Sequence, residues 1–372
     1  MRNMLNLIPK IFFIFIILLS SFSFAQNKNV KISDLQPKSE SSVFPLISIP
    51  ADKKVEEKIN TFLQVTELEN IPDTRKNPFQ LAQTASNSYT NYVSFYEWKK
   101  LETPKNILSL FFSGEATGAY SEMFDKWNSF DLRDGNYINI KDLLTDDGIA
   151  LVETKVNSAM KKEISDFIAE LKTENPTEKD EKERLEEQLF LYEDCLNWVN
   201  TQNLSWFEYY FEKDHITFVR GRCSNHAMRA LDDLYDYQIP VSYREIAPYL
   251  SDYGKSLIFN SPQNIGTENP SNKLYKGRID GKYEVYFLIN EINEDDSLSV
   301  TYWYGKYKKL INLRGEFVHN RFSLIEDDYH DENQQKWIPK AFIEIDLKGK
   351  KLIGTWQDFK TKKYLKLELE EL

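Results

Sequence analysis

Acid–base chemistry in this chain would have to rest on carboxylates. The 372 residues include only four histidines, and the sequence lacks nucleophile-elbow, zinc-protease, phosphate-loop and dinucleotide-binding motifs. Glu115 and Asp131 are the pair to test, because a glycosidase needs two carboxyl groups within ~5 to 10 Å across a cleft. A chain with 58 acidic residues contains such pairs by chance. We therefore favour a protein without catalytic residues or cofactor, and expect Asp131, like Asp134, to serve a turn.

Aromatic residues between positions 283 and 364 suggest a second chemistry, the binding of sugar rings or of an apolar ligand. Strand alternation puts Tyr302 and Tyr304 on one face of a strand and Trp303 on the other. One set would fill an interior, and the other would meet water or a ligand. Trp303 or Tyr304 together with Trp337 are our candidate ligand contacts, although packing explains most aromatic residues of this region.

Cys195 and Cys223 are the two cysteines of the chain. In an exported protein, the simplest interpretation is one disulfide bond. The alternatives are two free buried thiols or a metal site, since His226 follows Cys223 after two residues and His215 is nearby. Structural zinc needs four ligands, and these four residues are the only candidates. We favour the disulfide and expect no metal.

The N-terminus is typical of a secretory signal peptide. Arg2 and Lys10 flank the start of an apolar run from 11 to 19, and Ser23 and Ala25 occupy the small-residue positions before a cleavage site. The run is shorter than the ~20 residues that span a membrane. We expect cleavage after Ala25 and an exported soluble protein, periplasmic or extracellular, without a membrane span.

The chain is acidic. Loss of Arg2 and Lys10 with the signal peptide changes the formal net charge from −11 to −13. This charge disfavours nucleic acid and anionic membrane surfaces as partners and would attract a basic protein or a cationic ligand. The simpler interpretation is that it keeps an exported protein soluble. We expect an extracellular or periplasmic protein or glycan as the partner.

The segment from 114 to 144 organises the first half of the chain. Strand patterns at 128 to 132 and 136 to 140 flank Arg133-Asp134-Gly135, which predicts a hairpin because glycine tolerates a positive φ. Two amphipathic helical patterns follow, from about 148 to 171 and from 185 to 199. They predict an αα-hairpin packed on a sheet.

Length and composition predict two domains. After residue 274, eight short strand patterns separated by turn signals favour a small barrel, with a flattened sandwich as the alternative. The fold class is therefore α+β, an antiparallel sheet with a helical hairpin, followed by an all-β meander barrel. The expected divisions are a signal peptide (1–25), a flexible leader (26–43), the α+β domain (44–257), a linker (258–273) and the barrel (274–372).

Several short motifs follow one another in a recognisable order. They are Phe44-Pro45, Ile59-Asn60, Asn106 to Ser109, Gly114 to Ala119, Phe130 to Gly135, Ile140 to Leu143, Tyr237 to Ile246 and Pro248 to Leu250. This order resembles the extracytoplasmic domain of unknown function that occurs in lysozyme-sensing anti-sigma factors, beside peptidoglycan deacetylase domains and in stand-alone secreted proteins. The resemblance covers roughly residues 44 to 257 and implies an extracytoplasmic α+β domain, with a lysozyme-like protein as one expected ligand.

The chain departs from this family at one motif. Members usually carry Gly-Gly-Ala-His where this chain has Gly114-Glu115-Ala116-Thr117, so a role for that histidine is not expected. We also do not expect the anti-sigma role, because no transmembrane or sigma-binding region precedes the domain. The C-terminal meander is similar to small domains that end other secreted bacterial proteins.

These observations together predict an exported, non-catalytic binding module of the cell envelope with a protein or glycan ligand. The alternatives are a carboxylate-dependent hydrolase of cell-wall glycan and a structural envelope protein.

Overall fold

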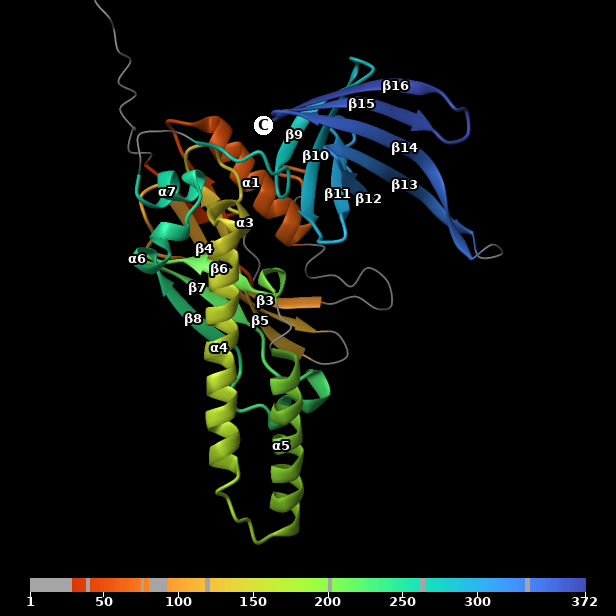
Figure 1. Cartoon of the computed structure of the whole chain (residues 1–372). Coiled ribbons are helices and arrows are strands. Elements are labelled where there is room, and N and C mark those ends of the chain that lie inside the picture. Colours follow the sequence, from red (N-terminus) through yellow and green to blue (C-terminus); the bar gives the residue numbers. More distant parts are fainter. Residues whose placement is uncertain are drawn as a thin grey trace, which may run out of the picture.

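The computed structural model describes residues 29–37, 41–74, 77–79, 92–117, 121–199, 203–260, 265–331 and 335–372. The predicted signal peptide lies outside these ranges. An N-terminal α+β region is followed by a closed barrel of antiparallel strands (Figure 1). The predicted fold class is thereby confirmed, and the sandwich alternative is wrong. Within the described ranges, no helix has the length and apolar character needed to cross a membrane.

The first described elements form a two-stranded ribbon packed on a helix. β1 (Lys31–Asp34) pairs with β2 (Pro45–Ser48), and α1 (Lys53–Leu68) follows. The expectation of a flexible leader is therefore wrong at β1. The polar composition of this segment predicted flexibility, but an edge strand needs only one apolar face. Ile32 and its neighbours supply that face by packing on the core.

The first three-stranded sheet consists of β3 (Tyr92–Lys100), β4 (Ile107–Thr117) and β5 (Ser121–Asp131), all antiparallel. The predicted turn follows β5, with Gly135 at a φ of +80°. The predicted second strand, 136 to 140, shrinks to one bridge between Phe130 and Tyr137. The strand stops there because Ile140 begins the short helix α3 (Ile140–Leu143).

The predicted αα-hairpin is present and projects from the body of the molecule (Figure 1). It consists of α4 (Asp146–Leu171) and α5 (Lys179–Val199), which share an apolar core with a second three-stranded sheet. The other elements of this part are η1 (Leu204–Trp206), β6 (Glu208–Phe211), β7 (His215–Arg220), η2 (His226–Leu231), β8 (Tyr237–Ser242), α6 (Tyr243–Ile246), η3 (Ala247–Tyr249) and α7 (Asp252–Ile258).

Cys195 on α5 is bonded to Cys223, which confirms the predicted disulfide. The metal alternative is wrong, because bonded sulfurs are not available as thiolate ligands. Across the described ranges, no group of three or more His, Cys, Asp or Glu side chains is placed to hold a metal ion.

We expect a double variant with Cys195→Ala and Cys223→Ala to lose about 3 to 4 kcal/mol of unfolding free energy. The bond closes a loop between residues separated by 28 positions, and this constraint lowers the entropy of the unfolded chain. Urea unfolding of the variant beside the oxidised wild type measures the loss. A difference below about 1 kcal/mol would show that the bond contributes little to stability.

The barrel closes because β9 pairs with both β10 and β16. Side chains alternate as predicted: Tyr302 belongs to the interior cluster with Tyr304 packed against it, whereas Trp303 lies outside. The strands are β9 (Leu274–Ile279), β10 (Tyr283–Ile292), β11 (Ser297–Tyr304), β12 (Ile311–Val318), β13 (Arg321–Asp331), β14 (Lys336–Lys348), β15 (Lys351–Asp358) and β16 (Tyr364–Glu371).

A buried ionic network joins the barrel to the α+β region. The Glu371 carboxylate lies 3.3 Å from Lys58 Nζ and 3.6 Å from Lys273 Nζ. The Asn136 amide also donates to Glu371, at 3.0 Å. These residues come from β16, α1, the position just before β9 and the turn after β5, so the network joins four segments at one point.

The segment predicted as a linker from 258 to 273 begins within α7 and is held in place where it is described again, from residue 265. The Asp142 carboxylate accepts hydrogen bonds from Thr267 Oγ1 at 2.9 Å and from Asn269 Nδ2 at 3.0 Å. Thr267 and Asn269, which gave this segment its linker-like composition, thus hold it against α3 by hydrogen bonds. The division into domains stays a prediction.

Candidate functional site

Glu115 and Asp131 do not form a pair of catalytic carboxyls. Glu115 on β4 faces Met123 on β5, and Asp131 lies eight positions further along β5. At ~3.4 Å per residue this separates the two residues by about 27 Å, beyond the range of a glycosidase pair.

Asp131 serves the turn, as its neighbours indicate. Its carboxylate accepts bonds from Arg133 Nε at 2.9 Å and from Arg133 Nη2 at 2.6 Å. Arg133 Nη1 in turn donates to Ser256 at 2.7 Å, which ties the turn to α7. The pair is therefore structural.

The three aromatic candidates of the barrel lie apart. Trp303 is only 2% exposed, because it packs with α1 and stacks on Tyr286 at 5.2 Å. Tyr304 packs on the opposite face, inside the barrel, beside Tyr302 and Tyr307. Trp337 is 55% exposed and contacts His330. Trp303 is thus not available to a ligand, and no shared platform of the three exists.

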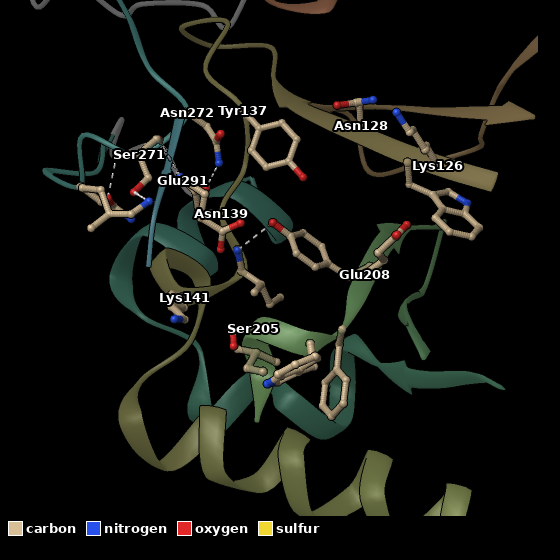
Figure 2. A pocket seen from close by; sticks show the side chains of 18 of the residues that line it. Lys126, Asn128, Tyr137, Asn139, Lys141, Ser205, Glu208, Ser271, Asn272 and Glu291 are labelled. Atoms are coloured by element: carbon tan, nitrogen blue, oxygen red, sulfur yellow. Dashed lines mark hydrogen bonds between the residues drawn. The ribbon is translucent and has the colours of Figure 1, made fainter. Parts of the chain in front are cut away.

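A cavity of about 770 Å³ lies where the α+β region meets the barrel (Figure 2). Its walls come from α1, β5, the turn and helix α3, η1 and β6, the segment before β9, and the barrel strands β10 and β12. Lining residues from these elements include Glu67, Trp127, Tyr137, Trp206, Glu208 and Glu291. The attached barrel supplies one wall of this cavity, through Glu291, Ile292 and Phe317.

Trp206 offers an exposed aromatic ring at the cavity. Asn203 Oδ1 accepts a hydrogen bond from the Ser205 amide at 3.2 Å, and this cap begins η1 at residues 204 to 206. The ring is 59% exposed although the Arg220 guanidinium lies 5.7 Å from its centroid. Arg220 therefore supports the ring while leaving it accessible.

Two further aromatic side chains line the cavity and are held by their neighbours. Trp127 stacks on Tyr210 with ring centroids 5.2 Å apart. Tyr137 stacks on Phe62 at 5.4 Å, and burial raises the pKa of Tyr137 to about 12. Its hydroxyl is thus neutral and able to donate a hydrogen bond at physiological pH.

Polar groups from the segment before β9 complete one wall. The Asn139 amide donates to the Ser271 carbonyl at 3.1 Å, and Asn272 Nδ2 donates to Asn139 Oδ1 at 2.8 Å. Figure 2 shows Asn139, Ser271 and Asn272 gathered at one side of the cavity. Asn139 Nδ2 donates to Asp142 Oδ2 as well, at 3.5 Å. Because an amide has two donors and an acceptor with two lone pairs, Asn272 keeps capacity for a ligand.

Glu67 is a carboxylate of the cavity whose oxygens are already engaged. Its Oε2 accepts from Tyr96 at 3.0 Å and from Lys126 at 3.1 Å, and its Oε1 accepts from Asn128 at 3.0 Å. Glu67 therefore joins α1 to the first sheet rather than presenting a nucleophile.

Glu208 is the perturbed carboxyl of the cavity. Desolvation by the surrounding protein raises its pKa to about 7; Lys126 opposes the rise, and the negative charges of Asp236, Glu67 and Asp125 add to it. The side chain nevertheless stays accessible to solvent. Such a shift at a concave site makes Glu208 a candidate functional residue.

We expect Glu208→Gln to raise the melting temperature at pH 8 and to leave it almost unchanged at pH 4.5. The folded protein holds a proton on Glu208 that the unfolded chain releases near pH 4.5, so the wild type loses stability as pH rises toward 7. Glutamine removes this loss. Melting curves from pH 4.5 to 8 measure the effect, and equal melting temperatures at pH 8 would contradict it.

The sequence did not point to this site. Glu208 and Trp206 lie in a segment that reads as an ordinary strand, and nothing in the sequence relates them to Glu291 or Tyr137. The short polar sequence Gln-Asn before Leu204 is a weak signal for a capped turn. A prediction of contacts between the two halves of the chain would have been needed.

Comparisons with known proteins give limited information. No protein-family model matches the chain, and no curated protein matches it. Among solved structures, a member of the DUF3298 family from Bacteroides fragilis is 12% identical, with a TM-score of 0.42; the match covers 63% of this chain and 99% of that one. A DUF3298 family protein from Pseudomonas aeruginosa is 9% identical, with a TM-score of 0.32, covering 60% and 94%. Scores this low carry no inference about function.

Proposed function

We propose that this protein is an exported glycan-binding module and that the cavity at Trp206 is its binding site. The observation that carries the proposal is the exposed ring of Trp206 beside amide and carboxyl side chains. An aromatic ring offers a flat apolar surface to the C–H face of a sugar, while amides and carboxylates bind its hydroxyls. The cavity of about 770 Å³ also falls in the usual range of small-ligand sites, ~300 to 1,000 Å³.

Export is part of this proposal. The disulfide between Cys195 and Cys223 fits an oxidising compartment, and the N-terminal sequence is typical of a signal peptide. An exported protein shares its compartment with the glycans of the cell envelope, so we propose such a glycan as the ligand.

A hydrolase acting on the same glycan is the second candidate. Glu208 favours it, because a pKa of about 7 suits a general acid. A glycosidase also needs a second carboxyl, and Glu67 is already bound by three donors. Glu291, on the barrel side of the cavity, would have to fill that role. Binding without turnover is thus the better supported function.

Isothermal titration of the mature protein, from Gln26, with soluble cell-wall glycan fragments tests the proposal. A parallel assay measures reducing ends released on incubation. Saturable binding without release supports the binding module. Release that disappears in Glu208→Gln supports the hydrolase, and the absence of both binding and release contradicts the proposed function.

A further inference from the structure

The cavity holds more negative charge than its own cations balance. Both of its lysines have carboxylate partners: Lys126 Nζ lies 3.1 Å from Glu67, and Lys141 Nζ lies 3.9 Å from Glu294. For Glu208 and Glu291, by contrast, neither a hydrogen bond nor an ion pair is found among the described residues. Two carboxyl groups therefore face the cavity without an ion pair or a hydrogen bond to the described part of the chain.

These two carboxyls belong to different walls. Glu208 is the first residue of β6, and Glu291 lies near the end of β10 in the barrel. In Figure 2 Tyr137 and Asn139 lie between them, so a ligand filling the cavity meets acidic groups on two sides. The negative charge of the cavity is thus spread over two walls.

The surroundings of Glu208 add to this effect. Glu67, Asp125 and Asp236 act on it as like charges, and Lys126 acts on it as an opposite charge. A ligand that brings a positive charge relieves this repulsion, whereas a neutral ligand only removes more water from the carboxyl. Aromatic rings such as Trp206 and Tyr137 also favour a cation at close range.

We propose that the cavity selects glycans that carry free, protonated amino groups over their N-acetylated counterparts. This inference rests on the proposed function. The sugar rings contact Trp206, and an ammonium group pairs with Glu208 or Glu291. An N-acetyl group carries no charge and only one N–H donor, so it cannot form that ion pair. Specificity therefore comes from the carboxyls and general affinity from the ring.

Titration with glucosamine tetramer and with N-acetylglucosamine tetramer at pH 7.5 and low salt tests this selection. We expect at least a tenfold preference for the glucosamine tetramer. A double variant with Glu208→Gln and Glu291→Gln should lose the preference and keep its affinity for the acetylated tetramer. Glu370→Gln, an exposed position on β16, is the control and should behave as the wild type.

The outcomes separate the two proposals. Equal affinity for both tetramers in the wild type overturns the selection of amines and leaves glycan binding in place. If neither tetramer binds, the proposed function fails with it. Spermidine serves as an amine without a sugar. Spermidine binding as tight as that of the glucosamine tetramer would overturn the assignment to an amino sugar.

The contribution of Glu208 to the selection should weaken with acid. Protons taken up by Glu208 near pH 7 remove one of the two negative charges, while Lys126, Asp125, Glu67 and Asp236 remain as its charged neighbours. The amines of the tetramer gain protons over the same range, so the contribution of Glu208 is measured against Glu208→Gln. Between pH 7.5 and 5.5 the preference of the wild type for the glucosamine tetramer should fall relative to that of the variant, and parallel curves would contradict the role of Glu208.

Discussion

Replacing Glu371 with glutamine is expected to lower the free energy of unfolding by about 3 to 5 kcal/mol. The Glu371 carboxylate is the shared acceptor for Lys58 and Lys273, and all three side chains are at most 4% exposed. Glutamine removes the negative charge and leaves two buried ammonium groups without it. Such a loss costs far more than removal of a surface ion pair, which contributes at most about 1 kcal/mol.

Urea unfolding at pH 7 measures this loss, with Glu370→Gln as the matched control. Glu370 is the preceding residue of β16 and is exposed, so its variant should remain within about 0.5 kcal/mol of the wild type. If both variants have the same stability, the network does not hold the barrel to the α+β region.

The pH dependence of Glu371→Gln has a defined sign. Burial alone would raise the pKa of Glu371, but Lys273, Lys58 and the Asn136 amide outweigh it and hold the pKa below 4.5. The wild type therefore keeps its advantage above pH 4.5 and loses it as the pH falls further and the carboxyl becomes protonated. The unfolding free energies of the wild type and of Glu371→Gln, each measured as a function of pH, should therefore converge below pH 4.5.

Trp206→Ala is expected to weaken glycan binding by about 30-fold or more while leaving the fold intact. An aromatic contact at the centre of a site commonly contributes 2 kcal/mol or more. The ring is already 59% exposed, so its removal leaves little empty space in the core. Isothermal titration with the oligosaccharide that binds the wild type gives the change in affinity.

Trp337→Ala is the matched control for Trp206→Ala. Trp337 is 55% exposed, close to the value for Trp206, but it lies on β14 and does not line the cavity. Its affinity for the glycan should equal that of the wild type. A loss of binding in Trp337→Ala, with none in Trp206→Ala, would move the site to the end of the barrel.

Much of the fold could be predicted because its signals are local. The helical periodicity of α4 and α5 and the turn signals between the barrel strands depend only on neighbouring residues. The prediction of element boundaries was wrong where a strand gives way to a helix within a few residues. The return strand predicted after Gly135 is cut short at Ile140, where α3 begins.

The site could not be predicted in the same way, because it depends on contacts between distant segments. Alternation correctly put Trp303 on the strand face opposite Tyr302 and Tyr304, but the sequence does not say that this face joins the same apolar core as α1. Glu208 looked like one acidic residue among 58. Its shifted pKa appears only when β5, β6 and α1 are packed together.

The most direct test of the glycan site uses the tryptophans as reporters. The chain has seven, and 19F NMR of protein labelled with 5-fluorotryptophan resolves a signal for each; single substitutions assign them. Titration with the glucosamine tetramer should shift the signals of Trp206 and Trp127 at the cavity and leave those of Trp337 and the buried Trp303 unchanged. Saturable binding that moves Trp337 or Trp303, with no change at Trp206, would contradict the cavity as the binding site.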